Sequence, residues 1–369
     1  MSFLAYSNPM NEQRLETSRL LQRFGFGPRP GEYAQALKDG LVATRAKVLT
    51  VPAVDAGAAK VVAPNITDLG QRPAPNTKEI VPFAIELRYQ IQQMTMWWLD
   101  RMAMSDHGLT EKMTWFWHGH WATSVGKVNF ALPMFIQNKT LRTHALGNFK
   151  DMSRAMINDS ALQFWLDGQD STLKSPNENL GRELMELFVL GVDRYTEDDV
   201  KGAARALTGY QVVNYEGSLT FNPKRHDPNP IAILGATQPF TGEQLSDFLV
   251  AREDCATFIA ERLWYRFISS TETMPASFGA KKAFATRDIS SAVKAMIQDP
   301  AVGDAKNDLV KSPVEWFIAA CRALELTPSN LKTPTQLINY LNQLNQVPFS
   351  PPNVGGWPAG EAWLSSAAV

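Results

Sequence analysis

The chain has 369 residues, of which 44% are hydrophobic and 20% charged, with a formal net charge of −1. This length and apolar content can bury a large core, and the 10% of aromatic residues excludes an intrinsically disordered chain. The near-neutral charge lacks the basic excess of a nucleic-acid-binding protein, and two cysteines are too few for a thiolate metal site.

The sequence predicts no membrane-spanning helix, because no run approaches about 18 uninterrupted apolar residues. Residues 1–13 are polar after Ser7 and have neither the basic region nor the apolar region of a secretory signal. As written, the chain is therefore expected to be cytoplasmic, or exported if a leader has been removed.

Apolar residues recur at helical spacing along most of the chain. Helices are predicted over 11–24 and 31–49, separated by the Gly- and Pro-rich segment 24–31. Residues 51–77 are rich in Ala, Val and Pro, which is typical of a surface linker or an insertion. Further helices are predicted over 79–105, 109–119, 127–147, 178–191, 196–209, 241–267, 283–298, 312–325 and 334–345.

One segment has the period of a β-strand. Residues 211–223 alternate apolar and other positions around Gly217, which predicts a small hairpin. The Pro- and Gly-rich segment 348–360 is predicted to be an irregular loop. The expected fold class is mostly α, a multi-helical globular domain with one hairpin. We divide it into an N-terminal helical pair (1–50), a linker or insertion (51–77) and a main helical domain (78–369).

The histidines cluster in the most aromatic third of the chain, at His107, His118, His120, His144 and His226. At about 100° per residue, His120 lies on the apolar face of its helix, and His118 points away from that face if the helix is unbroken. Because Gly119 separates them, the helix could instead end there and let both imidazoles converge. In the next helix, His144 falls within the apolar stripe.

A carboxylate also lies on an apolar face. In helix 178–191, Glu183 falls between apolar positions, where a charge is costly unless it is paired, hydrogen-bonded or bound to metal. Three helices thus each direct a polar group towards one core, namely His120, His144 and Glu183. Imidazole and carboxylate together suit a divalent transition metal such as zinc, iron, manganese or copper, or acid–base chemistry.

The first functional hypothesis is therefore a metal-dependent or acid–base enzyme with a site between helices. In it Glu183 acts as a ligand or general base, His144 binds metal or shuttles a proton, and Arg182 holds an anionic substrate group. The full set of candidate metal ligands is His118, His120, His144, Glu178, Glu183, His226 and Asp227.

The alternative hypothesis is a non-enzymatic helical scaffold or accessory protein that acts through a partner. In that case the same histidines and Glu183 form a buried polar network that fixes the register of the helices. The two hypotheses differ in what they require. The scaffold needs a fully satisfied polar core, no bound metal and no large pocket near His144.

Eight stretches resemble one bacterial family, catalogued as domain of unknown function 1800. They are LLQRFGFGP (20–28), EKMTWFWHGHWATS (111–124), LRTHALGNFKDM (141–152), PNENLGRELMELFVLGVDRYTEDDV (176–200), AARALTGY (203–210), HD (226–227), KSPVEW (311–316) and PPNVGGWPAGEAWL (351–364). The resemblance spans nearly the whole chain, and it includes the segments that carry His120, His144 and Glu183.

The resemblance has implications for location and partners. Members of that family are often exported and often encoded beside sulfatase-like proteins, so a sulfatase-like protein encoded nearby is the partner that the resemblance implies. Many relatives carry a leader that this chain lacks, and this departure weakens the expectation of export. Relatives usually continue beyond the position of Trp363, so a missing C-terminal portion is the corresponding expectation.

Overall fold

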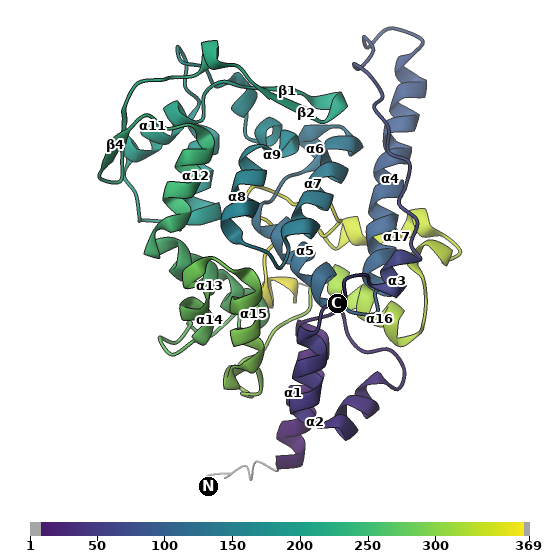
Figure 1. Cartoon of the computed structure of the whole chain (residues 1–369). Coiled ribbons are helices and arrows are strands. Elements are labelled where there is room, and N and C mark those ends of the chain that lie inside the picture. The colour runs from purple at the N-terminus through teal and green to yellow at the C-terminus, as the bar shows by residue number, and fades with distance from the viewer. Residues whose placement is uncertain (1–8, 365–369) are drawn as a thin grey trace.

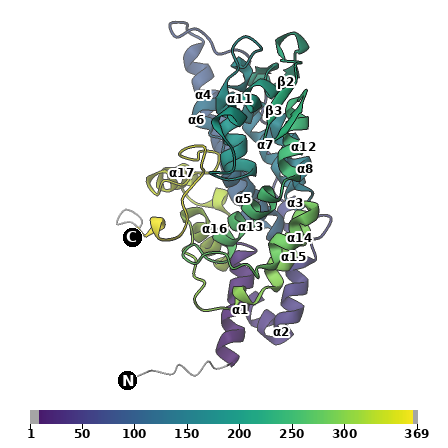
Figure 2. The same cartoon turned by 90° about the vertical axis from the view of Figure 1, so that its left-hand side faces the viewer.

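The computed structural model describes residues 9–364, and it confirms the predicted mostly-α class. This part of the chain contains seventeen α-helices and two antiparallel sheets of two strands each. The molecule is elongated, with α1 (Pro9–Arg23) and α2 (Glu32–Leu49) at one end and the β-strands towards the other (Figures 1 and 2). None of the described helices has the length and apolar character needed to cross a membrane.

The helices predicted over 11–24 and 31–49 are α1 and α2, which pack against each other. Gly40, with φ of 81°, kinks α2. Leu20 of α1 and Phe24, which follows the helix directly, belong to the main core, where the ring of Phe24 stacks on Phe267 at 5.7 Å. Since α1 shares this core with distant segments, the division of the chain into domains stays a prediction.

Figure 1 shows α5 (Leu109–His120), α7 (Ala131–His144), α8 (Phe149–Ile157) and α9 (Ser160–Trp165) at the centre of the molecule, with α4 (Ile80–Met104) along one side. They bury much of the aromatic and Met-rich part of the sequence. The helices α8 and α9 are absent from the predicted set. Their N-caps, Asn148 and Asp159, each accept a hydrogen bond from a backbone N–H of the first turn, as these residue types typically do.

Residues 51–77 contain one short helix, α3 (Ala56–Ala59), and are anchored at the corner between α4 and α5. The carboxylate of Asp55 accepts hydrogen bonds from the backbone N–H groups of Asp106 and His107 and from the hydroxyl of Ser105. Gly57 lies so close to this corner that a Cβ atom there would be 2.0 Å from the Met104 carbonyl oxygen. These contacts fix the path of the segment along the central helices.

The predicted helix 283–298 forms η5 (Phe284–Thr286) and α15 (Ile289–Gln298), and two further predicted helices are divided in the structure. The segment 127–147 forms α6 (Val125–Val128) and α7, separated by Asn129 in the left-handed conformation (φ 64°). The segment 241–267 forms α12 (Gly242–Ala251) and α13 (Glu253–Phe267), which meet at Arg252 in an extended conformation. Neither junction contains Gly or Pro, so the usual breaker signals are missing from the sequence.

The helix predicted over 178–191 changes its hydrogen bonding along its length. After α10 (Glu178–Glu183) comes a π-helical segment, η2 (Leu184–Val189), in which the Leu190 N–H donates to the Met185 carbonyl at 2.9 Å. Phe188 lies in its last turn, where a carbonyl has no partner within the helix. Single π-helical turns often occur at functional sites.

Both sheets are hairpins. The predicted one pairs β1 (Tyr210–Val213) with β2 (Ser218–Phe221). The second, β3 (Ile231–Ile233) with β4 (Ala236–Gln238), turns through Leu234 and Gly235, both of which have positive φ. Such turns usually contain Asn-Gly or Asp-Gly. Because these three-residue strands are joined by Leu-Gly, the sequence did not predict this hairpin.

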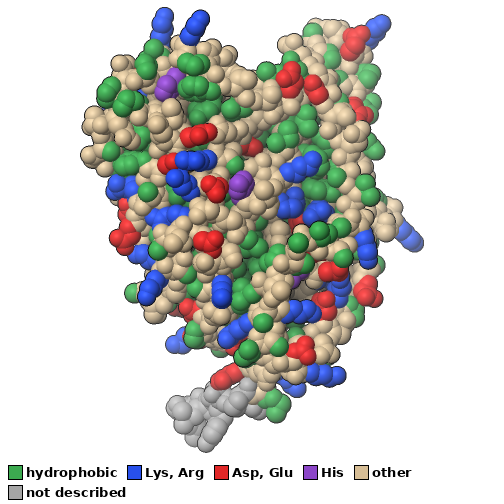
Figure 3. Space-filling view, in the orientation of Figure 1, with side chains coloured by type: hydrophobic (Ala, Val, Ile, Leu, Met, Phe, Trp, Pro, Cys, Tyr) green, Lys and Arg blue, Asp and Glu red, His purple; other side chains and the backbone are tan. Residues whose placement is uncertain are grey.

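The remaining elements surround these helices, and acidic and basic side chains are interspersed over the face seen in Figure 3. Thr196 and Asp199 form a capping box at the start of α11, with Asp in place of the usual Glu or Gln. The other helices are α11 (Glu197–Ala206), α14 (Gly279–Ala283), α15 (Ile289–Gln298), α16 (Pro313–Ala323) and α17 (Pro334–Gln343). Short 3-10 helices are η1 (Gly168–Asp170), η3 (Asn214–Glu216), η4 (Pro223–Arg225), η5 (Phe284–Thr286), η6 (Pro300–Val302), η7 (Pro328–Asn330) and η8 (Gly360–Trp363).

Asp159, the N-cap of α9, makes stability depend on pH. Its buried carboxyl accepts hydrogen bonds from the Leu162 N–H at 2.8 Å and from Gln137 Nε2 at 2.7 Å, and burial raises its pKa to about 7. The folded state therefore holds this proton more tightly than the unfolded chain, whose Asp pKa is about 4. The stabilisation is complete below about pH 4 and is lost as the pH rises to about 7.

We expect Asp159→Asn to become more stable relative to the wild type as the pH rises from about 4 to about 7. The amide keeps an acceptor oxygen but carries no charge, so the difference should grow by up to about 1.4 kcal/mol per pH unit. Urea unfolding of both proteins across this range measures the difference, and contributions from other titrating groups cancel. A difference that stays constant with pH would contradict the raised pKa.

Candidate functional site

The two histidines of α5 point into different surroundings, because the helix continues through Gly119 to His120. His118 is buried, and its Nε2 accepts a hydrogen bond from the Phe349 backbone N–H at 3.0 Å. Its ring also contacts the rings of Trp98, Trp115 and Trp357. Burial lowers the pKa of His118 to about 3, so this imidazole is neutral and part of an aromatic cluster.

His120 is equally buried, but only one of its nitrogens has a partner. Its Nε2 lies 2.8 Å from the Phe188 carbonyl of η2, and because a carbonyl can only accept, Nε2 carries the hydrogen. Burial, followed by the nearby Arg262 charge, lowers the pKa of His120 to about 3. Nδ1 is therefore an unprotonated acceptor, and no hydrogen-bond donor reaches it among the described residues.

The acidic candidates of α10 lie with Arg182 in one partly exposed patch. Arg182 donates to Glu178 at 3.1 Å and to both oxygens of Glu197, at 2.8 and 2.7 Å. Glu183 is half-buried, and burial, followed by the charge of Glu186, raises its pKa. Arg182 already pairs with two carboxylates, so it has little capacity left to hold an anionic substrate group.

The remaining candidates lie elsewhere. His226 shares a hydrogen bond with the Thr208 hydroxyl at 3.2 Å, and Asp227 accepts from Arg205 Nε at 2.6 Å. His144, the last residue of α7, is partly exposed and makes no side-chain hydrogen bond to the described part of the chain.

The seven candidate ligands thus occupy several separate neighbourhoods. Over residues 9–364, no group of three His, Cys, Asp or Glu side chains is placed to hold a metal ion. Metal binding and the catalytic roles of Glu183, His144 and Arg182 therefore stay predictions.

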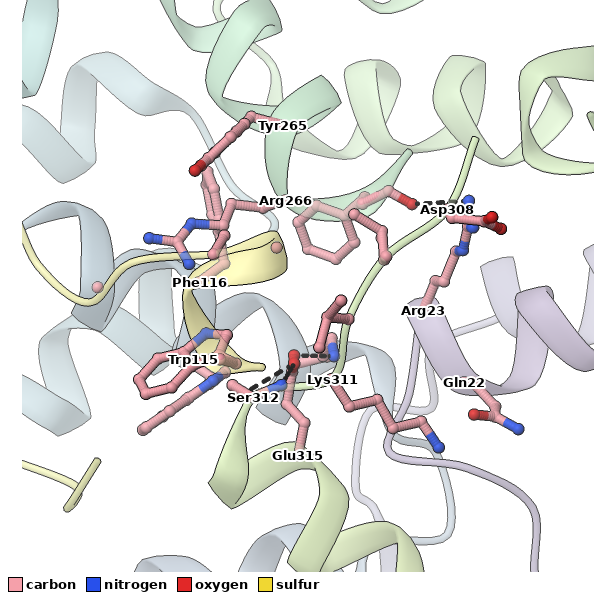
Figure 4. Close-up of a pocket in the computed structure, with 18 of the residues that line it drawn as sticks. Gln22, Arg23, Trp115, Phe116, Tyr265, Arg266, Asp308, Lys311, Ser312 and Glu315 are labelled. Atoms are coloured by element: carbon pink, nitrogen blue, oxygen red, sulfur yellow. Dashed lines mark hydrogen bonds and ion pairs between the residues drawn. The ribbon is translucent and has the colours of Figure 1, made fainter. Parts of the chain in front are cut away.

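A cavity of about 240 Å³ lies where α1, α5, α13 and α16 meet the segment 308–312 and the C-terminal segment 357–363 (Figure 4). We call it the cationic cavity, because basic side chains outnumber acidic ones along its wall. The basic ones are Arg19, Arg23, Lys112, Arg266 and Lys311, and the acidic ones are Asp308 and Glu315.

Two of these basic groups are neutralised by carboxylates. Arg19 pairs with Asp308 at 2.9 Å, and Lys112 pairs with Glu315. Glu315 is held in place by a capping box at the start of α16, in which it accepts hydrogen bonds from the backbone N–H and the hydroxyl of Ser312. The spacing of Ser312, Pro313 and Glu315 in the sequence is typical of such a helix start.

The other three basic groups form no ion pair with a described carboxylate. Arg23 donates to backbone carbonyls, including that of Ile268 at 2.9 Å, and burial followed by the Arg19 charge lowers its pKa to about 9. Arg266 donates to the carbonyls of Trp357 and Pro358. Lys311 has no hydrogen bond or ion pair among the described residues. A carbonyl satisfies an N–H group without neutralising its charge, so the cavity stays electropositive.

Aromatic side chains form much of the remaining wall. Trp115 and Trp357 stack with ring centroids 5.0 Å apart and an interplanar angle of 23°. The indole N–H of Trp357 is buried and lacks an acceptor in the described structure. Figure 4 shows Trp115, Phe116 and Tyr265 on the side of the cavity opposite Arg23. The other aromatic lining residues are Phe267 and Trp363.

A second cavity, of about 180 Å³, lies at the C-terminal end of α5, where His120 lines it. We call it the His120–Arg262 cavity; its other lining residues are Glu186, Leu187, Gly191, Val192, Arg194, Phe258, Glu261, Val354 and Gly355. Both cavities thus use α5, α13 and the C-terminal segment 354–363. That segment is seated on α5 by a close approach of two glycines. A Cβ atom on Gly356 would lie 2.2 Å from the Gly119 carbonyl oxygen.

Sequence reasoning missed the arginines of both cavities. Arg262 and Arg266 are one turn apart on α13, but a helix wheel does not reveal which neighbouring helix each one faces. A signal did exist for Arg23, Lys311 and Trp357, because each lies in a stretch that carries the family resemblance.

Comparison with known proteins identifies the family. A family model described as "Protein of unknown function (DUF1800)" matches residues 19–369, which include all residues of the His120–Arg262 cavity and nearly all of those that line the cationic cavity. No curated protein and no solved structure matches the chain. Because the match covers nearly the whole chain, this protein belongs to the DUF1800 family.

Proposed function

We propose that this protein binds a small anionic molecule with a flat ring in the cationic cavity. The observation that carries the proposal is the set of three basic groups, Arg23, Arg266 and Lys311, that face one cavity without a carboxylate partner. The charge of Arg23 is buried and that of Arg266 is partly buried, which is costly unless each is paired, and an anionic ligand would supply the missing partner. Lys311 is exposed and adds a positive charge at the same cavity.

The aromatic wall of the cavity supports the proposal that the ligand contains a flat ring. The stacked Trp115 and Trp357 offer a flat apolar surface for a ring, and the free indole N–H of Trp357 offers a donor to a polar group on it. The volume of about 240 Å³ lies below the 300–1,000 Å³ typical of cavities for drug-sized ligands, which favours a small molecule.

Four of the stretches that carry the family resemblance meet in this cavity, although they lie far apart in the sequence. They contribute Arg23 (20–28), Trp115 (111–124), Lys311 (311–316) and Trp357 (351–364). This convergence favours a ligand-binding site over a purely structural role for these segments. Turnover of the ligand by Glu183, His144 or Arg182 is not required by the proposal.

Phenyl phosphate, which joins an anion to an aromatic ring, is a suitable probe, with inorganic phosphate as the probe that lacks the ring. We expect calorimetric titration at low salt to show binding of phenyl phosphate that is weakened about tenfold in Lys311→Gln, since a hydrogen bond to a charged group contributes about 1.5–3 kcal/mol. Lys311 is suited to this test because it supports no other residue.

Lys332→Gln is the matched control, because Lys332 is exposed and does not line the cavity. Its affinity for phenyl phosphate should equal that of the wild type. Absence of binding to the wild type, or equal loss in the two lysine variants, would contradict the proposed site. Inorganic phosphate should bind more weakly than phenyl phosphate if the aromatic wall contributes.

A further inference from the structure

The His120–Arg262 cavity contains a guanidinium group with no partner. Arg262 makes no hydrogen bond and no ion pair to any described residue, and its Nε is fully buried. Burial, followed by the charge of Arg266 one turn away, lowers the pKa of Arg262 to about 10, and neither carboxylate that lines the cavity, Glu186 or Glu261, forms an ion pair with Arg262. A buried guanidinium nitrogen without an acceptor is uncommon in proteins.

The same cavity contains an acceptor with no donor. His120 lines it, and its Nδ1 is unprotonated because the hydrogen is on Nε2, which donates to Phe188. Nδ1 is buried and has no donor among the described residues.

The acidic residues of the cavity are already engaged. Glu186 accepts a hydrogen bond from the Tyr195 hydroxyl at 2.5 Å, and Glu261 pairs with Arg194 at 3.3 Å. The unengaged groups are thus one cationic donor, Arg262, and one neutral acceptor, His120 Nδ1. Their complement is a molecule with an anionic acceptor beside a neutral hydroxyl donor.

We infer that the His120–Arg262 cavity binds a small hydroxy-carboxylate, whose carboxylate pairs with Arg262 and whose hydroxyl donates to His120 Nδ1. The volume of about 180 Å³ suits a molecule of few atoms. Leu187, Val192 and Phe258 provide apolar contacts for its carbon skeleton. An ammonium group in place of the hydroxyl is disfavoured, because it would lie beside the positive charge of Arg262, which has no ion-pair partner among the described residues.

The site is separate from the proposed function of the cationic cavity. The two cavities share α5, α13 and the C-terminal segment, but no single residue lines both. One ligand class is an anion with a ring and the other is an anion with a hydroxyl. The two proposals can therefore fail independently.

Glycolate is the probe for this inference. Acetate lacks its hydroxyl and ethylene glycol lacks its carboxylate, so the three molecules separate the two predicted contacts. We expect calorimetric titration of the whole chain to give the order glycolate, acetate, ethylene glycol from tightest to weakest. Glycolate that does not bind would overturn the inference, and acetate binding as tightly as glycolate would overturn the role of His120.

Two substitutions test the residues. Arg262→Gln removes the charge, and His120→Gln removes the Nδ1 acceptor while its amide keeps a donor near the Phe188 carbonyl. Each should weaken glycolate binding at least about tenfold. Arg88→Gln is the matched control, because Arg88 is an exposed arginine of α4 outside both cavities, and its affinity should not change.

The lysine variant distinguishes this site from the cationic cavity. Lys311→Gln should leave glycolate binding unchanged while it weakens phenyl phosphate binding, and Arg262→Gln should weaken glycolate binding. If Lys311→Gln weakened glycolate binding as much as Arg262→Gln does, glycolate would occupy the other cavity and the inference would fail. If His120→Gln does not fold, which circular dichroism reveals, Arg262→Gln and the comparison with acetate still decide the question.

Discussion

Replacing Glu111 by alanine is expected to destabilise the fold by about 3–5 kcal/mol, the range for removing one partner of a buried charge pair. The side chain of Glu111 is only 3% exposed and accepts hydrogen bonds from Arg142 Nε at 2.8 Å, Arg142 Nη2 at 2.9 Å, Arg101 Nε at 3.0 Å and Trp98 Nε1 at 3.0 Å. Burial alone would raise its pKa, but the two guanidinium groups hold that pKa below its usual range.

The loss would be large because two positive charges remain without their carboxylate. Arg101 and Arg142 both approach the Trp97 ring, at 5.5 and 5.1 Å, so neither side chain can turn away without losing a packed contact. Urea unfolding of Glu111→Ala measures the cost. Glu86→Ala, at an exposed position of α4, is the control and should change stability by less than about 0.5 kcal/mol. A similarly small change for Glu111→Ala would refute the buried network.

Helical periodicity predicted most of the helices because each depends mainly on its own apolar face. The divisions at Asn129 and Arg252 escaped prediction because they depend on how successive helices pack, and neither residue type forbids a helix. The Leu234–Gly235 turn escaped for a related reason. Its positive φ at Leu234 is held by the surrounding strands and not by the residue's own preference.

The candidate site could be predicted only in part. The apolar-face argument correctly placed His120 in the interior, where it is 2% exposed, but it also placed His144 there. His144 is partly exposed because α7 ends at this residue, and a helix wheel holds no information about where the neighbouring elements stop. Periodicity gives the face of a helix, whereas a cavity is formed by several segments at once.

Both cavities are built from segments that lie far apart in the sequence. Arg23 and Trp357 both line the cationic cavity although they are near opposite ends of the chain. His120 and Arg262 line one cavity because α5 and α13 lie on either side of it. No local sequence pattern predicts which distant side chains line the same cavity. The family stretches indicated which segments matter, and the structure supplied which of their side chains share a cavity.

Gly356→Ala is expected to destabilise the protein by about 2–5 kcal/mol and to impair both cavities. Gly356 has φ of 80°, which costs an L-residue about 1–2 kcal/mol, and the added Cβ would meet the Gly119 carbonyl oxygen at 2.2 Å, which adds about 1–3 kcal/mol of overpacking. The backbone that follows Gly356 is fixed. Trp357 is buried against Trp115, and the carbonyls of Trp357 and Pro358 accept hydrogen bonds from Arg266.

Gly70→Ala separates the two causes, because Gly70 has φ of 71° but a Cβ atom there would meet nothing within 4 Å. It should show only the conformational cost, and the difference in unfolding free energy between the two variants then measures the contact of Gly356 with α5. The segment 354–363 lines both cavities, so Gly356→Ala should weaken the binding of both phenyl phosphate and glycolate, whereas Gly70→Ala should weaken neither.

Equal stability losses in the two variants would mean that the C-terminal segment moves away from α5 at little cost. A destabilised Gly356→Ala that still bound both probes normally would show that neither site depends on how this segment is seated.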